Sequence, residues 1–142
     1  GFLYLLGNRN ENGVDFNISS NNGASSSIYR FGNEKGFKKL NMSGITKLDM
    51  KRLDSLFQTS ELSLYNHWVI DVQGAELLVL EGAGELLKGC SSIFIEVSSR
   101  NVYENGVQWD AIKEFLNSHN FIELWKPNEK SHENVIFVRD LK

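Results

Sequence analysis

Apolar residues recur along the chain with two different periods, and the period separates predicted strands from predicted helices. Residues 2–6 (FLYLL) form an apolar run, and apolar and polar side chains alternate at residues 14–18 and 47–51. Alternation is typical of a strand with one solvent-facing side. Residues 19–27 and 32–44 are rich in small polar side chains and glycine, which predicts flexible loops.

The second half of the chain repeats a unit in which an apolar strand precedes a helix or a loop. Residues 68–72 (WVIDV) form an apolar run closed by Asp71, as expected for a strand buried on both faces of a parallel sheet. Helical spacing follows until the glycines of residues 82–84 (GAG), which we interpret as a helix end. A second apolar strand at residues 92–97 also meets an acid, Glu96, near its carboxyl end.

The remaining elements complete an α/β pattern. A helical turn is predicted at residues 53–57, and an amphipathic helix at residues 109–120. Residues 121–125 and 135–138 predict two strands whose short connection suits an antiparallel hairpin. The order strand, helix, strand, helix, strand, strand predicts one α/β domain over residues 1–142, with a mainly parallel sheet and an antiparallel C-terminal hairpin. The apolar face of the long helix consists of Ile112, Phe115, Leu116 and His119.

Composition narrows the class of protein. The chain has 142 residues, 41% hydrophobic and 23% charged, which suits a single domain with a buried core. The net charge is -3 and the basic residues are scattered, so the chain has no positively charged surface that would attract a phosphate backbone. We therefore expect no nucleic-acid partner. Cys90 is the only cysteine, which excludes an internal disulfide and fits a reducing compartment. No apolar run approaches the roughly 20 residues that span a bilayer, so we expect a soluble, cytoplasmic protein.

Two acids and an amide are the candidate chemistry, because ligands of open α/β sheets bind outside the carboxyl ends of the strands. Asp71 and Glu96 occupy such ends, in strands that we expect to be neighbours. Asp71 could accept a substrate proton, coordinate a metal or bind a cofactor. Gln73 adds a neutral donor and acceptor, and Gly74 permits a sharp turn. The structural alternative is that these residues cap the following helix. Three widely separated histidines give no zinc-ligand spacing, and we expect no metal site.

Several short motifs, in order, resemble one enzyme family. The motifs are GVDF (13–16), NGASSS (22–27), LDSL (53–56), DVQGAE (71–76), LEGA (80–83) and IEV (95–97). Together they resemble the C-terminal part of the FkbM-type S-adenosylmethionine-dependent methyltransferases, over roughly residues 15–138. The resemblance implies a class I, Rossmann-like sheet whose last strand is antiparallel, and transfer of a methyl group from S-adenosylmethionine, usually to oxygen.

The resemblance also implies roles for individual residues. Asp71 lies beside the methyl-donor end, Glu96 flanks the acceptor, and both are expected catalytic residues. Residues 2–6 correspond to the family's third strand. The expected cofactor contacts are Gly7, Asn8, Asp71, Val72 and Gln73. The expected contacts with a small-molecule acceptor are Asn22, Ser25, Ser26 and Gln73.

The chain departs from the family at the cofactor site. It has neither the glycine-rich turn after the first strand nor the acid after the second, and it opens directly into an apolar run. We therefore expect an N-terminally truncated domain that is inactive or binds S-adenosylmethionine weakly. An open strand edge would remain, and we expect self-association or residues 2–6 to cover it. The alternative to a methyltransferase is a non-catalytic α/β module that assembles through this edge.

Overall fold

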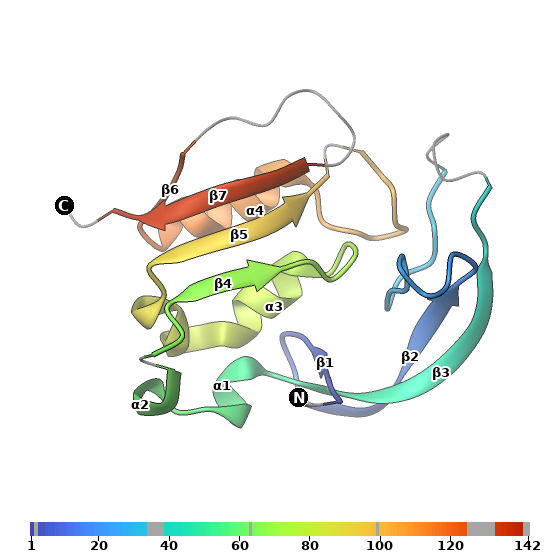
Figure 1. Ribbon diagram of the computed structural model, residues 1–142, viewed down its shortest axis with the longest axis horizontal. Helices are drawn as coiled ribbons and strands as arrows, with labels where there is room; N and C mark the ends of the chain where they lie inside the picture. The colour runs from blue at the N-terminus through green and yellow to red at the C-terminus, as the bar shows by residue number, and fades with distance from the viewer. Residues whose placement is uncertain (2, 34–38, 63, 99, 125–132, 141–142) are drawn as a thin grey trace.

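Two sheets form the framework of the protein, seen in a computed structural model that describes residues 1, 3–33, 39–62, 64–98, 100–124 and 133–140 (Figure 1). The first sheet has the order β1-β3-β2, and the second has the order β4-β5-β7-β6. The strands of the first sheet are β1 (Leu5–Leu6), β2 (Glu11–Ser19) and β3 (Met42–Lys51). Those of the second are β4 (His67–Ile70), β5 (Ser92–Val97), β6 (Phe121–Glu123) and β7 (Glu133–Arg139).

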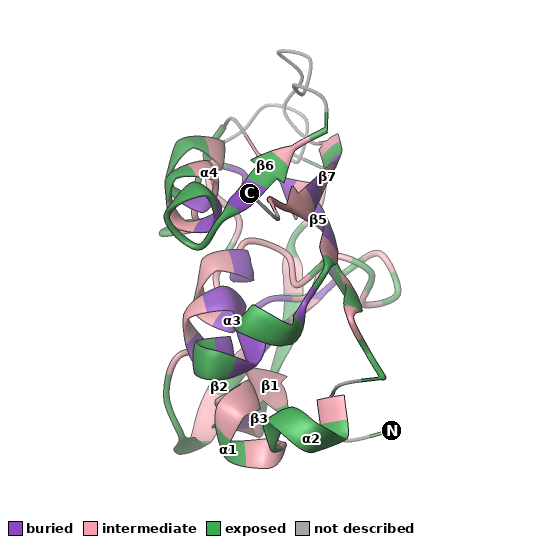
Figure 2. Cartoon of the chain, turned by 90° about the vertical axis from the view of Figure 1, so that its left-hand side faces the viewer, coloured by how far each residue is buried: buried purple, intermediate pink, exposed green. Residues whose placement is uncertain are grey.

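The two longest helices cover one face of the four-stranded sheet (Figures 1 and 2). They are α3 (Glu76–Ala83), which continues into a 3-10 helix, η2 (Gly84–Gly89), and α4 (Trp109–Ser118). Two single-turn helices, α1 (Leu53–Leu56) and α2 (Thr59–Leu62), lie below the free side of β4 in Figure 1. The core between sheet and helices includes Leu80, Ile93, Ile95, Ile112, Leu116, Phe121, Val135 and Phe137.

The predicted α/β class is confirmed, and the mainly parallel sheet is present only in part, because both sheets are mixed. Strand β1 pairs parallel with β3 and β4 pairs parallel with β5, whereas β2–β3, β5–β7 and β6–β7 are antiparallel. The predicted hairpin of β6 and β7 is present. The class I sheet is therefore present only in part, as the parallel pair β4–β5 followed by an antiparallel last strand.

Strand β3 is longer than the strand predicted at residues 47–51. Its first residues, 42–46, are exposed or half-buried on both faces, so the sequence shows no alternation there and predicts a loop. Backbone pairing with β2 extends the strand to Met42 nevertheless. The short helix α2 was also missed. Residues 125–132, which include part of the predicted strand 121–125, lie outside the described residues, as does Phe2 of the predicted run 2–6.

Strand β4 was expected to be buried on both faces, and this expectation is wrong. The side chain of Val69 is 76% exposed, whereas Ile70 points into the core at 5%. In the described chain no helix covers the sheet face opposite α3 and α4 (Figure 2). Strand β4 also stands at the edge of its sheet, and Leu5 and Leu6 pair with β3 instead of covering it.

The predicted helix end at residues 82–84 is confirmed, and Gly82 has a packing role besides. Helix α3 runs through Gly82 and ends at Ala83, and Gly84 follows with a positive φ of 50°. A Cβ on Gly82 would meet the carbonyl oxygen of Gly7 at 1.9 Å. Gly82 therefore allows the turn after β1 to pack directly on the helix backbone.

Candidate functional site

The parallel register of β4 and β5 brings the two predicted acids together. Val69 pairs with Phe94 and Ile70 with Ile95, so the next residues in line are Asp71 and Glu96. Because side chains alternate along a strand, both acids follow Val69 and Phe94 onto the sheet face that the helices leave uncovered. The expectation that the two strands are neighbours is confirmed.

The side-chain amide of Gln73 bridges the two carboxyl groups. Its Nε2 donates to Asp71 Oδ1 at 2.5 Å and to Glu96 Oε2 at 3.0 Å. An amide nitrogen carries two hydrogens, so this nitrogen is fully used by the two acids. Two acids at adjacent strand ends are thus joined by one neutral donor.

The backbone between β4 and α3 is held in a conformation that points Gln73 at the acids. Gln73 has a left-handed φ of 56° and Gly74 a φ of 99°. The buried carboxyl of Glu76, only 3% exposed, accepts from the backbone N–H groups of Val72 and Gly74 at 3.2 and 3.1 Å. The Ser27 hydroxyl donates to the Gln73 carbonyl at 2.7 Å. Glu76 therefore takes the turn-capping role that the structural alternative gave to Asp71 or Gln73.

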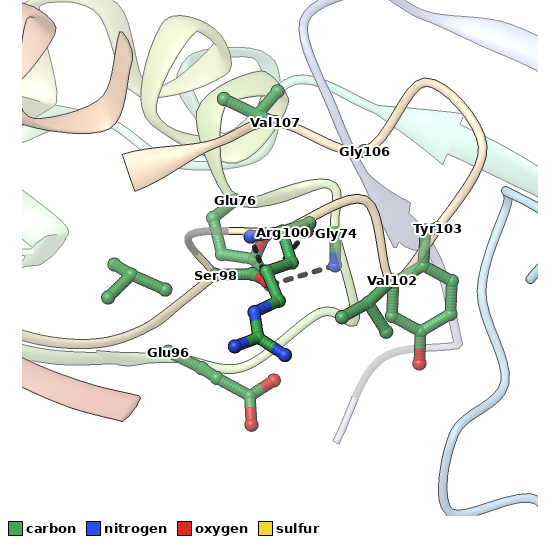
Figure 3. Close-up of a pocket in the computed structure, with 10 residues that line it drawn as sticks. Gly74, Glu76, Glu96, Ser98, Arg100, Val102, Tyr103, Gly106 and Val107 are labelled. Atoms are coloured by element: carbon green, nitrogen blue, oxygen red, sulfur yellow. Dashed lines mark hydrogen bonds between the residues drawn. The ribbon is translucent and has the colours of Figure 1, made fainter. Parts of the chain in front are cut away.

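Tyr103 completes the cluster, and the sequence analysis missed it. Its hydroxyl donates to Gln73 Oε1 at 2.6 Å and also lies 3.2 Å from the carbonyl oxygen of Ser25. Tyr103 is buried, with 3% of the residue exposed. Its ring packs over Gly74 and stacks on the ring of Phe31, with 5.5 Å between the ring centroids. Tyr103, Gly74 and Glu96 all line one small cavity of about 10 Å³ (Figure 3).

Burial and like charges set the electrostatics of the cluster. Burial, followed by the charges of Asp71 and Glu76, raises the pKa of Glu96 to about 7, while the hydrogen bond from Gln73 acts in the opposite direction. Burial also raises the pKa of Glu76 and of Tyr103. The Tyr103 hydroxyl therefore stays protonated at neutral pH and is available as a donor.

A pocket of about 450 Å³ opens beside the cluster, between the two sheets. Asp71, Val72, Gln73 and Ser26, four of the predicted contact residues, line it. Its volume lies within the range of about 300–1,000 Å³ typical of small-molecule sites. Most of the remaining wall is apolar and comes from Tyr4, Leu5, Leu6, Phe16, Ala24, Ile28 and Ala75.

The other predicted contact residues lie away from the lining of this pocket. Gly7 is buried against Met50 and Gly82, and Asn8 Nδ2 donates to Glu81 Oε2 at 2.8 Å. Ser25 contacts the cluster through its backbone carbonyl, which lies 3.2 Å from the Tyr103 hydroxyl. Asn22 is an exposed turn residue with a φ of 58°. The loop that holds these polar residues is tied by its own hydrogen bonds, such as Ser25 N to Ser19 Oγ at 3.0 Å.

Comparison with known proteins identifies the family. The family model described as the methyltransferase FkbM domain matches residues 3–123. The chain belongs to the FkbM methyltransferase family. Relative to the expected 15–138, the match begins and ends earlier, so it includes β1 but stops before β7. No curated protein and no solved structure matches the chain significantly.

The FkbM domain offers a partial fit to S-adenosylmethionine. In favour, the pocket brings the Asp71 carboxylate and the Gln73 amide together with apolar side chains. Against the fit, the predicted cofactor contact Gly7 is packed inside the protein.

No helix among the described residues is long and apolar enough to cross a membrane.

Proposed function

We propose that this FkbM domain takes part in S-adenosylmethionine-dependent transfer of a methyl group to an oxygen of a small molecule. One observation carries the proposal: two carboxyl groups share the Gln73 amide at the rim of a pocket of ligand size. When bound, S-adenosylmethionine supplies an electrophilic methyl group on a sulfonium. The chain must then hold the acceptor in line and accept the proton of its hydroxyl.

The two carboxyl groups are suited to that second task in different ways. Asp71 lines the pocket and can contact a bound group directly. Glu96, with a pKa raised to about 7, lies near the value at which a general base works best at neutral pH. We assign the acceptor proton to this pair, with Asp71 as the residue in contact and Glu96 on the acceptor flank.

The lining of the pocket is mixed. Apolar side chains from β1, β2 and the Ser26 segment contribute to its wall, and Tyr4, Ser26, Asp71 and Gln73 add polar groups. We assign this pocket to the cofactor, and a hydroxyl of a small metabolite, a sugar or a lipid is the expected acceptor beside it.

We expect weak cofactor binding by this chain, because the glycine-rich turn that normally holds the cofactor is absent from its sequence. The test is titration with S-adenosylhomocysteine, followed by NMR of the backbone amides. The expected result is a Kd of roughly 1 mM, with shifts confined to residues 71–73 and the pocket wall. Asp71→Asn should weaken binding several-fold, and Asp110→Asn, an exposed acid on α4, should leave it unchanged.

The absence of any shift at several millimolar ligand would overturn the assignment of this pocket to the cofactor. Shifts that map elsewhere would do the same. The non-catalytic assembly module would then remain the better description.

A further inference from the structure

The orientation of the Gln73 amide is a choice between two arrangements that differ by a half-turn. With Nε2 toward the acids, the amide donates to Asp71 and Glu96; with Oε1 toward them, it would present an acceptor to two acceptors. In the observed arrangement Oε1 faces away from the acids and needs a donor. Among the described residues the Tyr103 hydroxyl, at 2.6 Å, is that donor.

We propose that Tyr103 is a positioning residue of the methyl-transfer site, whose hydroxyl holds the Gln73 amide with its nitrogen between the carboxyl groups of Asp71 and Glu96. The inference deepens the proposed function, since it concerns the same acids. It gives Tyr103 no contact with substrate or cofactor. Its effect on the acids passes through Gln73 alone.

The position of Tyr103 in the fold supports this role. It lies between β5 and α4, thirty residues along the chain from Gln73, yet Val107 N donates to Gly74 O and so ties its segment to the Gln73 turn. From the other side the Ser25 carbonyl lies 3.2 Å from the same hydroxyl. The hydroxyl has one proton, and the shorter distance assigns it to Gln73.

Several charged or titratable groups face Glu96 and must be considered in any pH experiment. Asp71 follows β4, Glu76 begins α3, and Tyr103 lies in the connection after β5. Arg100, from that same connection, lines the small cavity with Glu96. A substitution at Tyr103 must therefore leave the other three groups, Asp71, Glu76 and Arg100, in place.

Tyr103→Phe meets this requirement, because it removes the hydroxyl and keeps the ring that packs on Gly74 and Phe31. The readout is the titration of the Glu96 side-chain carbon by NMR. A carboxylate that loses a donor becomes easier to protonate, so the Glu96 titration should move upward by about 0.5–1 pH unit. Tyr65→Phe is the matched control, since Tyr65 is exposed and precedes the start of β4, whereas Asp71 follows its end, and it should cause no shift.

A second pair of variants tests the route through Gln73. Gln73→Leu should raise the Glu96 titration by itself, and adding Tyr103→Phe should then cause no further change. An unchanged titration in Tyr103→Phe overturns the proposal, even if the variant is less stable, because that would be a purely structural role. A shift that persists in the Gln73→Leu background also overturns it. Neither result depends on cofactor, so the proposed function can fail separately.

Discussion

Protonation of Glu96 should be visible in the pH dependence of stability. Its folded-state pKa, raised to about 7, is above the ordinary value, so between about pH 4.5 and 7 the folded chain binds more protons than the unfolded chain. Stability therefore falls as pH rises through this window and is level above it. The raised pKa of Glu76 acts in the same direction.

Glu96→Gln should remove part of this loss of folding stability with rising pH. We expect the variant to be more stable than the parent at pH 8 by on the order of 1 kcal/mol, since one pKa unit is worth about 1.4 kcal/mol and partial solvent exposure screens some of it. The difference should shrink toward pH 4.5. Urea unfolding at several pH values measures it, with exposed Glu114→Gln on α4 as the control. An equal loss of stability with rising pH in parent and variant would contradict the prediction.

The acids could be predicted from the sequence, whereas the residues that organise them could not. Asp71 and Glu96 end two apolar strands, and the period of a strand places them on one face once those strands pair. Tyr103 reaches Gln73 across thirty residues in a connection without a motif. Glu76 looks like an ordinary first-turn acid, and only the left-handed backbone at Gln73 turns it into the acceptor for two N–H groups.

Among the elements, the end of helix α3 combines a local rule with a packing constraint. A glycine inside a helix normally costs about 1 kcal/mol relative to alanine, which suggests a helix end at residues 82–84. The helix does end there, at Ala83, and Gly82 lies in its last turn because the Gly7 carbonyl occupies the space that a Cβ would need. The sequence shows the glycine but not the backbone that packs on it.

Gly82→Ala should therefore destabilise the protein despite its better helix propensity. Overpacking of this kind typically costs about 1–3 kcal/mol, and here the clash is with a backbone carbonyl that a side-chain rotation cannot relieve. Gly89→Ala in η2 is the matched control, because its Cβ would meet nothing within 4 Å; we expect it to be neutral or slightly stabilising. Unfolding in urea compares the two, and a stabilised Gly82→Ala would show that β1 does not pack on α3 as described.

For the molecule as a whole, the unusual feature is the four-stranded sheet, which has one face without a covering helix among the described residues and has β4 at one of its edges (Figure 2). The exposed apolar residues Val69, Phe94, Ile122 and Leu124 all belong to or follow strands of this sheet. An apolar groove of about 280 Å³, lined by residues of β1, α1, α2 and β4, runs beside the open edge. The α/β class follows from the order of elements, but the uncovered face does not, because the apolar pattern of β4 is the same for a strand that is covered.

We predict that this edge drives self-association. Strand β4 carries no lysine or proline that would discourage strand pairing, and Val69 lies on its exposed face. Sedimentation velocity should therefore show a concentration-dependent dimer or larger species. Val69→Lys should shift it toward monomer by about tenfold or more in Kd, because a charge would be buried at the new contact. Ile45→Lys, at an exposed apolar position of β3 in the other sheet, should leave association unchanged. A parent chain that stays monomeric at all concentrations, with β4 amides open to hydrogen exchange, would refute association through this edge and leave the bare strand as a stable feature of the domain.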